Sequence, residues 1–140
     1  MGRSRLTNQL GSLRNEHLLN RVHPGSNSVG WLLRHIAEVE LLFAKNVFGS
    51  DIEVKAQTIG SIAKDRGQFH ELKPLLELTK RAEDELGSSI RTIDDWNGQV
   101  TTAEFGTVTK LEALGRIMTH TAYHAGQIGL AVKYGKPYPD

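Results

Sequence analysis

The sequence lacks several features that mark particular classes of protein. It contains no cysteine, which excludes a disulfide framework, a thiolate metal ligand and a cysteine nucleophile. Lysine and arginine total 17 against 16 acidic residues, so no strong field would draw nucleic acid or an anionic membrane to it. No apolar run is long enough to span a bilayer, and the first residues are polar rather than signal-like. We therefore expect a cytoplasmic protein without nucleic-acid or membrane partners.

The composition that is present is typical of one globular domain spanning residues 1–140. Hydrophobic residues make up 39% of the chain and charged residues 24%, as in ordinary globular proteins. A chain of this length buries about 68% of its unfolded surface, enough for a single core. No internal repeat or low-complexity tract divides it.

Apolar residues recur at a spacing of three or four through most of the chain, and this period predicts helices rather than strands. The expected helices cover residues 6–22, 29–47, 71–95 and 109–134. The first would end at the turn formed by Pro24 and Gly25. The last would begin with a capping box between Thr109 and Glu112.

Two stretches between the expected helices have no persistent helical period. Residues 50–70 are rich in polar residues and glycine, and we interpret them as a crossover connection between the second and third helices. Residues 97–108 form a loop rich in β-branched residues, with an extended excursion expected there. Four amphipathic helices around one core predict an all-α protein, a four-helix bundle.

Two histidines lie four residues apart inside the last expected helix. His120 and His124 would point the same way from that helix, because residues i and i+4 share a face. Two imidazoles so placed can reach one metal ion, which takes nitrogen ligands at roughly 2.0–2.1 Å. His35 lies within the apolar face of the second expected helix and is the candidate third ligand, since bundles build metal sites from facing helices.

Several familiar chemistries do not fit this pattern. A metalloprotease of the His-Glu-x-x-His type needs glutamate directly after its first histidine, where this chain has Thr121. The di-iron signature needs a glutamate three residues before a histidine, and neither His35 nor His120 has one. What is left is a neutral three-histidine site, whose ion would act as a Lewis acid or lower the pKa of a bound water or thiol. The residues identify no general base, and histidines simply packed in the core are the plainer alternative.

Four further residues are expected to line the site or to orient its ligands: Glu38, Gln127, Tyr123 and Trp31. Glu38 and Gln127 each follow one of the histidines by about one helical turn. A structural metal site is usually closed by a fourth protein ligand, for which His17 or Glu38 would be the candidates. An open fourth position would instead favour catalysis.

Two segments resemble the DinB/YfiT-like four-helix-bundle metalloproteins. Residues 28–38, Ser-Val-Gly-Trp-Leu-Leu-Arg-His-Ile-Ala-Glu, are similar to the second helix of that family. Residues 120–128, His-Thr-Ala-Tyr-His-Ala-Gly-Gln-Ile, are similar to its fourth helix, and residues 133–140 to its usual tail. The resemblance covers the chain in helix order. It implies an up-down-down-up bundle, a homodimer, and a divalent metal ion, zinc or nickel, held by His35, His120 and His124.

The same resemblance implies a range of functions. Characterised members of the wider superfamily include thiol-dependent enzymes, namely bacillithiol transferases and a mycothiol-dependent maleylpyruvate isomerase. It therefore implies a metal-dependent thiol S-transferase or hydrolase with a small-molecule substrate. Because the chain has no cysteine, the thiol would come from a low-molecular-weight cosubstrate. The alternative is a non-enzymatic dimeric bundle with a structural or incidental metal, acting through partner binding.

Overall fold

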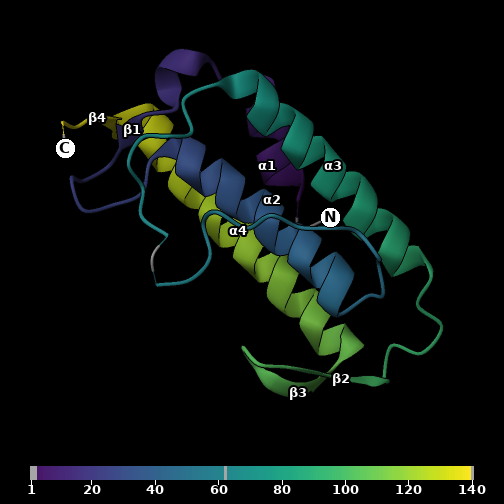
Figure 1. Ribbon diagram of the computed structural model, residues 1–140. Helices are drawn as coiled ribbons and strands as arrows, with labels where there is room; N and C mark the ends of the chain where they lie inside the picture. Colours follow the sequence, from purple (N-terminus) through teal and green to yellow (C-terminus); the bar gives the residue numbers. More distant parts are fainter. Residues whose placement is uncertain (1–2, 62, 140) are drawn as a thin grey trace.

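The computed structural model describes residues 3–61 and 63–139, and its chain is mostly helical (Figure 1). Within these residues the α-helices are α1 (Ser4–Leu10), α2 (Val29–Asn46), α3 (Leu72–Arg91) and α4 (Lys110–Tyr134). Two antiparallel strand pairs accompany them: β1 (Asn20–Arg21) with β4 (Lys136–Pro137), and β2 (Gln99–Thr102) with β3 (Gly106–Thr109). None of the helices in this described part combines the length and apolar character needed to cross a membrane.

The helix α2 is the central element, since it packs against both α3 and α4. It begins where the sequence predicts, because the Ser28 hydroxyl accepts a hydrogen bond from the Trp31 backbone N–H and so caps the helix. Leu33 and Ile36 on its inner side are fully buried, and Ile128 of α4 belongs to the same core cluster. Burial of this apolar face holds α2 and α4 in one fixed relation.

The ends of α3 and α4 are set by local hydrogen bonds. At the start of α4, the Thr109 hydroxyl and the Glu112 carboxylate each accept the other's backbone N–H, which confirms the predicted capping box. The helix α3 ends at Arg91, so the predicted end at residue 95 is wrong. The N–H groups of Thr92 and Ile93 donate to carbonyls three residues back, a tighter turn that closes the helix.

The predicted first helix over residues 6–22 is wrong in extent. Only Ser4–Leu10 is α-helical, followed by a 3-10 turn over Asn15–His17 and by strand β1. Leu13 and Leu18 are nevertheless buried, so these apolar residues enter the core from irregular backbone. Strand β1 pairs with β4 near the end of the chain, and that long-range pairing competes with helix formation.

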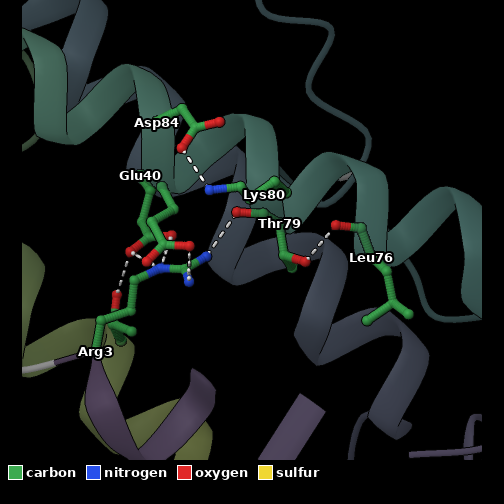
Figure 2. A network of polar contacts seen from close by, with 8 residues as sticks. Arg3, Glu40, Leu76, Thr79, Lys80 and Asp84 are labelled. Carbon is green, nitrogen blue, oxygen red and sulfur yellow. Dashed lines mark hydrogen bonds and ion pairs between the residues drawn. The ribbon is translucent and has the colours of Figure 1, made fainter. Parts of the chain in front are cut away.

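A polar network around Arg3 and Glu40 joins the short α1 to the other three α-helices (Figure 2). Arg3, just before α1, donates through Nε to both carboxylate oxygens of Glu40 on α2, at 3.0 and 3.1 Å. Its Nη2 donates to the Thr79 carbonyl on α3 at 2.7 Å. The Thr121 hydroxyl of α4 also donates to Glu40, which is only 1% exposed. Burial raises the pKa of Glu40, and the Arg3 charge opposes that rise.

The stretches without helical period behave differently from one another. The described part of residues 50–70 contains neither helix nor strand. Residues 97–108 contain most of the β2–β3 hairpin, which is the extended excursion that their β-branched composition predicts.

Candidate metal centre

Three histidines from two helices converge on one point. His35 comes from α2, and His120 and His124 come from successive turns of α4. One nitrogen from each ring lies within 4.8 Å of the others, and they form a group that could hold a metal ion. The Nε2 atoms of His35 and His120 are 3.1 Å apart. The packing of α2 on α4 thus brings together the three residues expected from the sequence.

His35 is held by a hydroxyl and a buried carboxylate behind it. Its Nδ1 lies 3.2 Å from the Thr58 hydroxyl oxygen, and that hydroxyl donates to Glu38 at 2.7 Å. Since the hydroxyl hydrogen is used toward Glu38, the oxygen is free to accept a hydrogen from Nδ1 of His35. The imidazole then carries its hydrogen on Nδ1 and presents the Nε2 lone pair to the other histidines.

The Glu38 carboxylate supports the site, and both of its oxygens already accept hydrogen bonds within the protein. It is 1% exposed, and its carboxylate accepts backbone N–H groups from Gln57 at 2.8 Å and Thr58 at 2.9 Å. The guanidinium of Arg34 donates to its second oxygen. These bonds hold the Gln57–Thr58 backbone against α2, so Glu38 places the hydroxyl that orients His35.

His124 and His35 have further neighbours on their own helices. The Nδ1 atom of His124 lies 2.6 Å from the amide oxygen of Gln127, which can only accept, so the ring hydrogen is on Nδ1. The Gln127 amide nitrogen in turn donates to the Tyr123 hydroxyl at 3.4 Å. Trp31 is nearly buried and stacks on His35, with ring centroids 4.9 Å apart. The structure therefore places all four of the expected neighbours in contact with the histidines or their supports.

The environment keeps the imidazoles neutral. Burial, followed by the charge of His124, lowers the pKa of His35 to about 4. The pKa of His120 is also lowered to about 4, again chiefly by burial, and burial lowers the pKa of His124. At neutral pH all three rings therefore offer lone pairs and carry no charge. That is the form that binds a metal ion.

The donor set fits a divalent transition metal. Two nitrogen atoms bound to one zinc ion in tetrahedral geometry would be about 3.3 Å apart. The Nε2 atoms of His35 and His120 are 3.1 Å apart, which is close to that value. Nδ1 of His120 is buried without a hydrogen-bond partner among the described residues, so no contact there fixes the tautomer of this ring. Its Nε2 can donate a hydrogen to Nε2 of His35 or, in the other tautomer, offer a lone pair to an ion. Imidazole ligands suit zinc, nickel, copper and iron.

No fourth His, Cys, Asp or Glu of the described residues joins the three-histidine group. The two residues that could have closed the site are engaged elsewhere. Nδ1 of His17 accepts the backbone N–H of Arg14, and Glu38 is saturated as described. Among the described residues, the three histidines are therefore the whole of this candidate ligand group.

A cavity of about 1070 Å³ opens beside His35 and His120. Its walls come from α2, from α4 and from the β2–β3 hairpin. The apolar side chains that line it are Val39, Leu42, Phe43, Ile59, Phe105 and Val108. Tyr123 of the expected site residues also lines it.

Two contributors to this site could not be expected from the sequence. Thr58 lies in the irregular connection, where no period or motif marks it. Phe105 lies in the turn of the hairpin, and only the fold of that hairpin onto α2 and α4 brings it to the cavity. In the sequence, the support behind His35 is indicated only by Glu38, which follows it by one helical turn.

The fold and the site together define a class: a mostly helical protein whose α2 and α4 carry a three-histidine group able to hold a metal ion. The chain belongs to the DinB superfamily, whose family model matches residues 1–128. Comparison with curated proteins and with solved structures gives no match.

Proposed function

We propose that the protein is a metal-dependent enzyme of the thiol S-transferase or hydrolase type, with His35, His120 and His124 holding a zinc or nickel ion. The observation that carries the proposal is the group of three neutral imidazoles, without a fourth protein ligand among the described residues, at the edge of a large cavity. Catalytic metal sites keep such an open position, whereas structural sites fill it.

The residues of the chain have separable tasks in this proposal. A divalent ion bound there would supply Lewis acidity and favour the deprotonated form of a thiol or water. Thr58 and Gln127 hold His35 and His124 in the tautomer that presents Nε2. The apolar side chains of the cavity wall would contact the apolar part of a substrate. The thiol is a small cosubstrate, because the chain has no cysteine, and free thiols persist in a reducing cytoplasm.

The first test is the metal content of protein purified without a histidine tag. We expect about one zinc or nickel ion per chain. His120→Ala should lose both this ion and the activity that the unmodified protein shows in a screen of thiols against electrophiles. His70→Ala is the matched control, because His70 is exposed and outside the group, and it should keep the metal. Full metal occupancy in His120→Ala would refute the site.

A second candidate function is a non-enzymatic homodimer, and one surface favours dimerisation. Residues 117–132 of α4 contain no Asp, Glu, Lys or Arg. The large apolar residues exposed on this helix are Leu111, Met118, Tyr123, Leu130 and Tyr134. A helix face left in water normally carries charge. A second copy of the chain packed against the side of α4 that carries Tyr123, Leu130 and Tyr134 would explain why residues 117–132 lack charge.

The homodimer is tested by sedimentation. We expect the unmodified protein to sediment as a dimer and Leu130→Lys to shift it toward the monomer. Val22→Lys, an equally apolar exposed position outside α4, should leave the dimer intact. A dimer without metal and without activity toward thiols would favour the non-enzymatic function. A monomer at all concentrations would remove the dimer proposal.

We also propose the up-down-down-up order of the bundle, with the chain between α2 and α3 as the crossover connection. The colours of Figure 1 support it: along α2 and α3 they advance in the same direction, and along α4 in the opposite one.

A further inference from the structure

We propose that the cavity beside the three histidines takes ligands with an uncharged, flat apolar body, and that Phe105 in the β2–β3 hairpin is the residue that selects them. The inference rests on the proposed function, because the donor atom of such a ligand would lie at the histidines. It goes beyond that function by naming the class of molecule and the side chain that recognises it.

Phe105 is held between the two helices that carry the histidines. Its ring stacks on Phe43 of α2, with centroids 5.8 Å apart and planes inclined by 29°. The guanidinium of Arg116, on α4, lies 4.9 Å from the centroid of the same ring. Both neighbours line the cavity with Phe105. The hairpin therefore adds to the cavity wall an aromatic side chain that contacts residues of both helices.

The separation of this aromatic surface from the histidines sets the size of the ligand. Phe43 follows His35 by eight residues, a rise of about 12 Å along α2. Arg116 precedes His120 by four residues, about 6 Å along α4. Val39 lies between His35 and Phe43 and lines the wall. Next to Arg116, a Cβ added at Gly115 would meet nothing within 4 Å. A ligand with its donor atom at the histidines thus has room for an aromatic group about five bonds further on, since five bonds of an extended chain span about 6 Å.

The charges at this end of the cavity disfavour an anionic body. Arg116 is the one guanidinium of the lining, and its positive charge lies over the Phe105 ring. Glu104 and Glu112 line the same end, so the carboxylates outnumber the cation. An anionic group would meet a net negative wall, whereas a neutral aromatic ring would exchange water for contact with Phe105 and its apolar neighbours.

The test compares three thiols that share one head group: N-methyl-, N-benzyl- and N-(carboxymethyl)-2-mercaptoacetamide. Each is titrated into cobalt(II)-loaded protein, and binding is followed by the thiolate-to-cobalt charge-transfer absorption, which needs no turnover. We expect the benzyl compound to bind at least about tenfold more tightly than the methyl compound, as burial of a phenyl ring allows. We expect the carboxymethyl compound to gain nothing over the methyl compound.

The variants identify the residue responsible. Phe105→Ala should remove most of the benzyl preference and leave the affinity for the methyl compound within about twofold, since the shared head group is untouched. Thr107→Ala, in the same hairpin but away from the cavity, should keep the full preference. If Phe105→Ala loses its native circular dichroism, Phe105→Leu replaces it and should lose part of the preference.

The outcomes separate this inference from the proposed function. Failure of the unmodified protein to retain cobalt would overturn both. Cobalt retained with equal affinity for all three thiols, or a benzyl preference that survives in Phe105→Ala and Phe105→Leu, would overturn the inference alone. Tighter binding of the carboxymethyl compound than of the benzyl compound would assign the cavity to anionic ligands instead.

Discussion

Single residues differ in how firmly they hold the three imidazoles. His35 is oriented through Thr58 by a carboxylate that is itself saturated, and His124 is oriented by Gln127. His120 has no such partner at Nδ1 among the described residues. The position of its ring therefore depends on packing and on the Nε2 contact with His35. Orienting contacts of this kind raise the affinity of a metal site, because they remove rotational freedom before the ion arrives.

Replacing Thr58 should weaken metal binding without removing a ligand. In Thr58→Val the His35 Nδ1–H loses its acceptor and Glu38 loses one donor, so we expect metal affinity to fall by about tenfold or more. Thr58→Ser keeps the hydroxyl and should bind metal nearly as well as the unmodified protein. Competition against a chromophoric chelator measures both. Equal affinity in Thr58→Val would show that the hydroxyl does not orient the ring.

The depressed pKa values of the histidines predict the pH dependence of the metal-free protein. As pH falls below 6.5 the unfolded chain takes up protons on these rings, while the folded chain resists until about pH 4 for His35 and His120. The unfolded state binds more protons in this window, so stability must fall as pH falls through it. After allowance for solvent screening of partly exposed rings, we expect a loss of roughly 1–2 kcal/mol between pH 7 and pH 5.

Urea unfolding with a chelator present measures this dependence. His120→Leu is the comparison, because it removes one of the depressed groups and should show a smaller loss over the same range. Stability that is constant or rises between pH 7 and pH 5 would contradict the lowered pKa values.

Among the elements, α2 depends most on the irregular chain around it. Near its start, the Gly30 N–H donates to the Leu18 carbonyl at 2.8 Å. A Cβ built on Gly30 would lie 1.9 Å from the Phe69 carbonyl oxygen. The glycine thus allows two non-helical segments, from opposite sides of α2 in the sequence, to lie directly on the helix. His35 lies five residues further along the same helix.

Gly30→Ala should therefore destabilise the protein by more than about 2 kcal/mol, because the new methyl group overlaps backbone atoms that cannot rotate away. Gly87→Ala on α3 is the matched control. There the nearest atom is the flexible Arg91 side chain at 3.6 Å, and alanine should stabilise the helix by about 0.5–1 kcal/mol. Thermal unfolding followed by circular dichroism measures both. A neutral Gly30→Ala would show that the segments do not pack on α2 as described.

For the whole molecule, the Arg3 network replaces the packing that a longer first helix would have supplied. The described helix α1 is only seven residues long, too short to be stable by itself. Arg3 nevertheless joins it to α2 and α3 through Glu40 and the Thr79 carbonyl, and Thr121 adds α4 to the same carboxylate. The Arg3–Glu40 pair thereby links all four α-helices of the described residues (Figure 2).

Removing only one charged partner of this network should lower the free energy of unfolding. Arg3→Met leaves the Glu40 carboxylate buried without its cation, and we expect a loss of about 2–4 kcal/mol in the free energy of unfolding. The double variant Arg3→Met with Glu40→Leu removes both buried charges and should recover at least half of that loss. Urea denaturation of Arg3→Met, Glu40→Leu and the double variant gives the coupling free energy between the two side chains. Strictly additive effects would mean that the two side chains do not depend on each other.

The helices α2, α3 and α4 could be predicted from the sequence because their causes are local. Apolar residues at intervals of three and four define their buried faces, and the caps at Ser28 and Thr109 act within one turn. The shared face of His120 and His124 follows from the same geometry. The convergence of His35 on this pair could be expected, since bundles place side chains of facing helices together.

The tertiary structure alone decided the rest. The apolar pattern that begins with Leu6 and Leu10 continues through Leu13 and Leu18 to Val22 and predicts one helix. Strand β1 nevertheless pairs with β4 more than a hundred residues later, and no local pattern indicates that pairing. The positions of Thr58 behind His35 and of Phe105 in the cavity wall likewise depend on contacts between segments far apart in the chain. The sequence by itself determined which side chains could hold a metal ion, because helix periodicity is local. The shape of the cavity beside them, and what supports each ring, came from long-range packing.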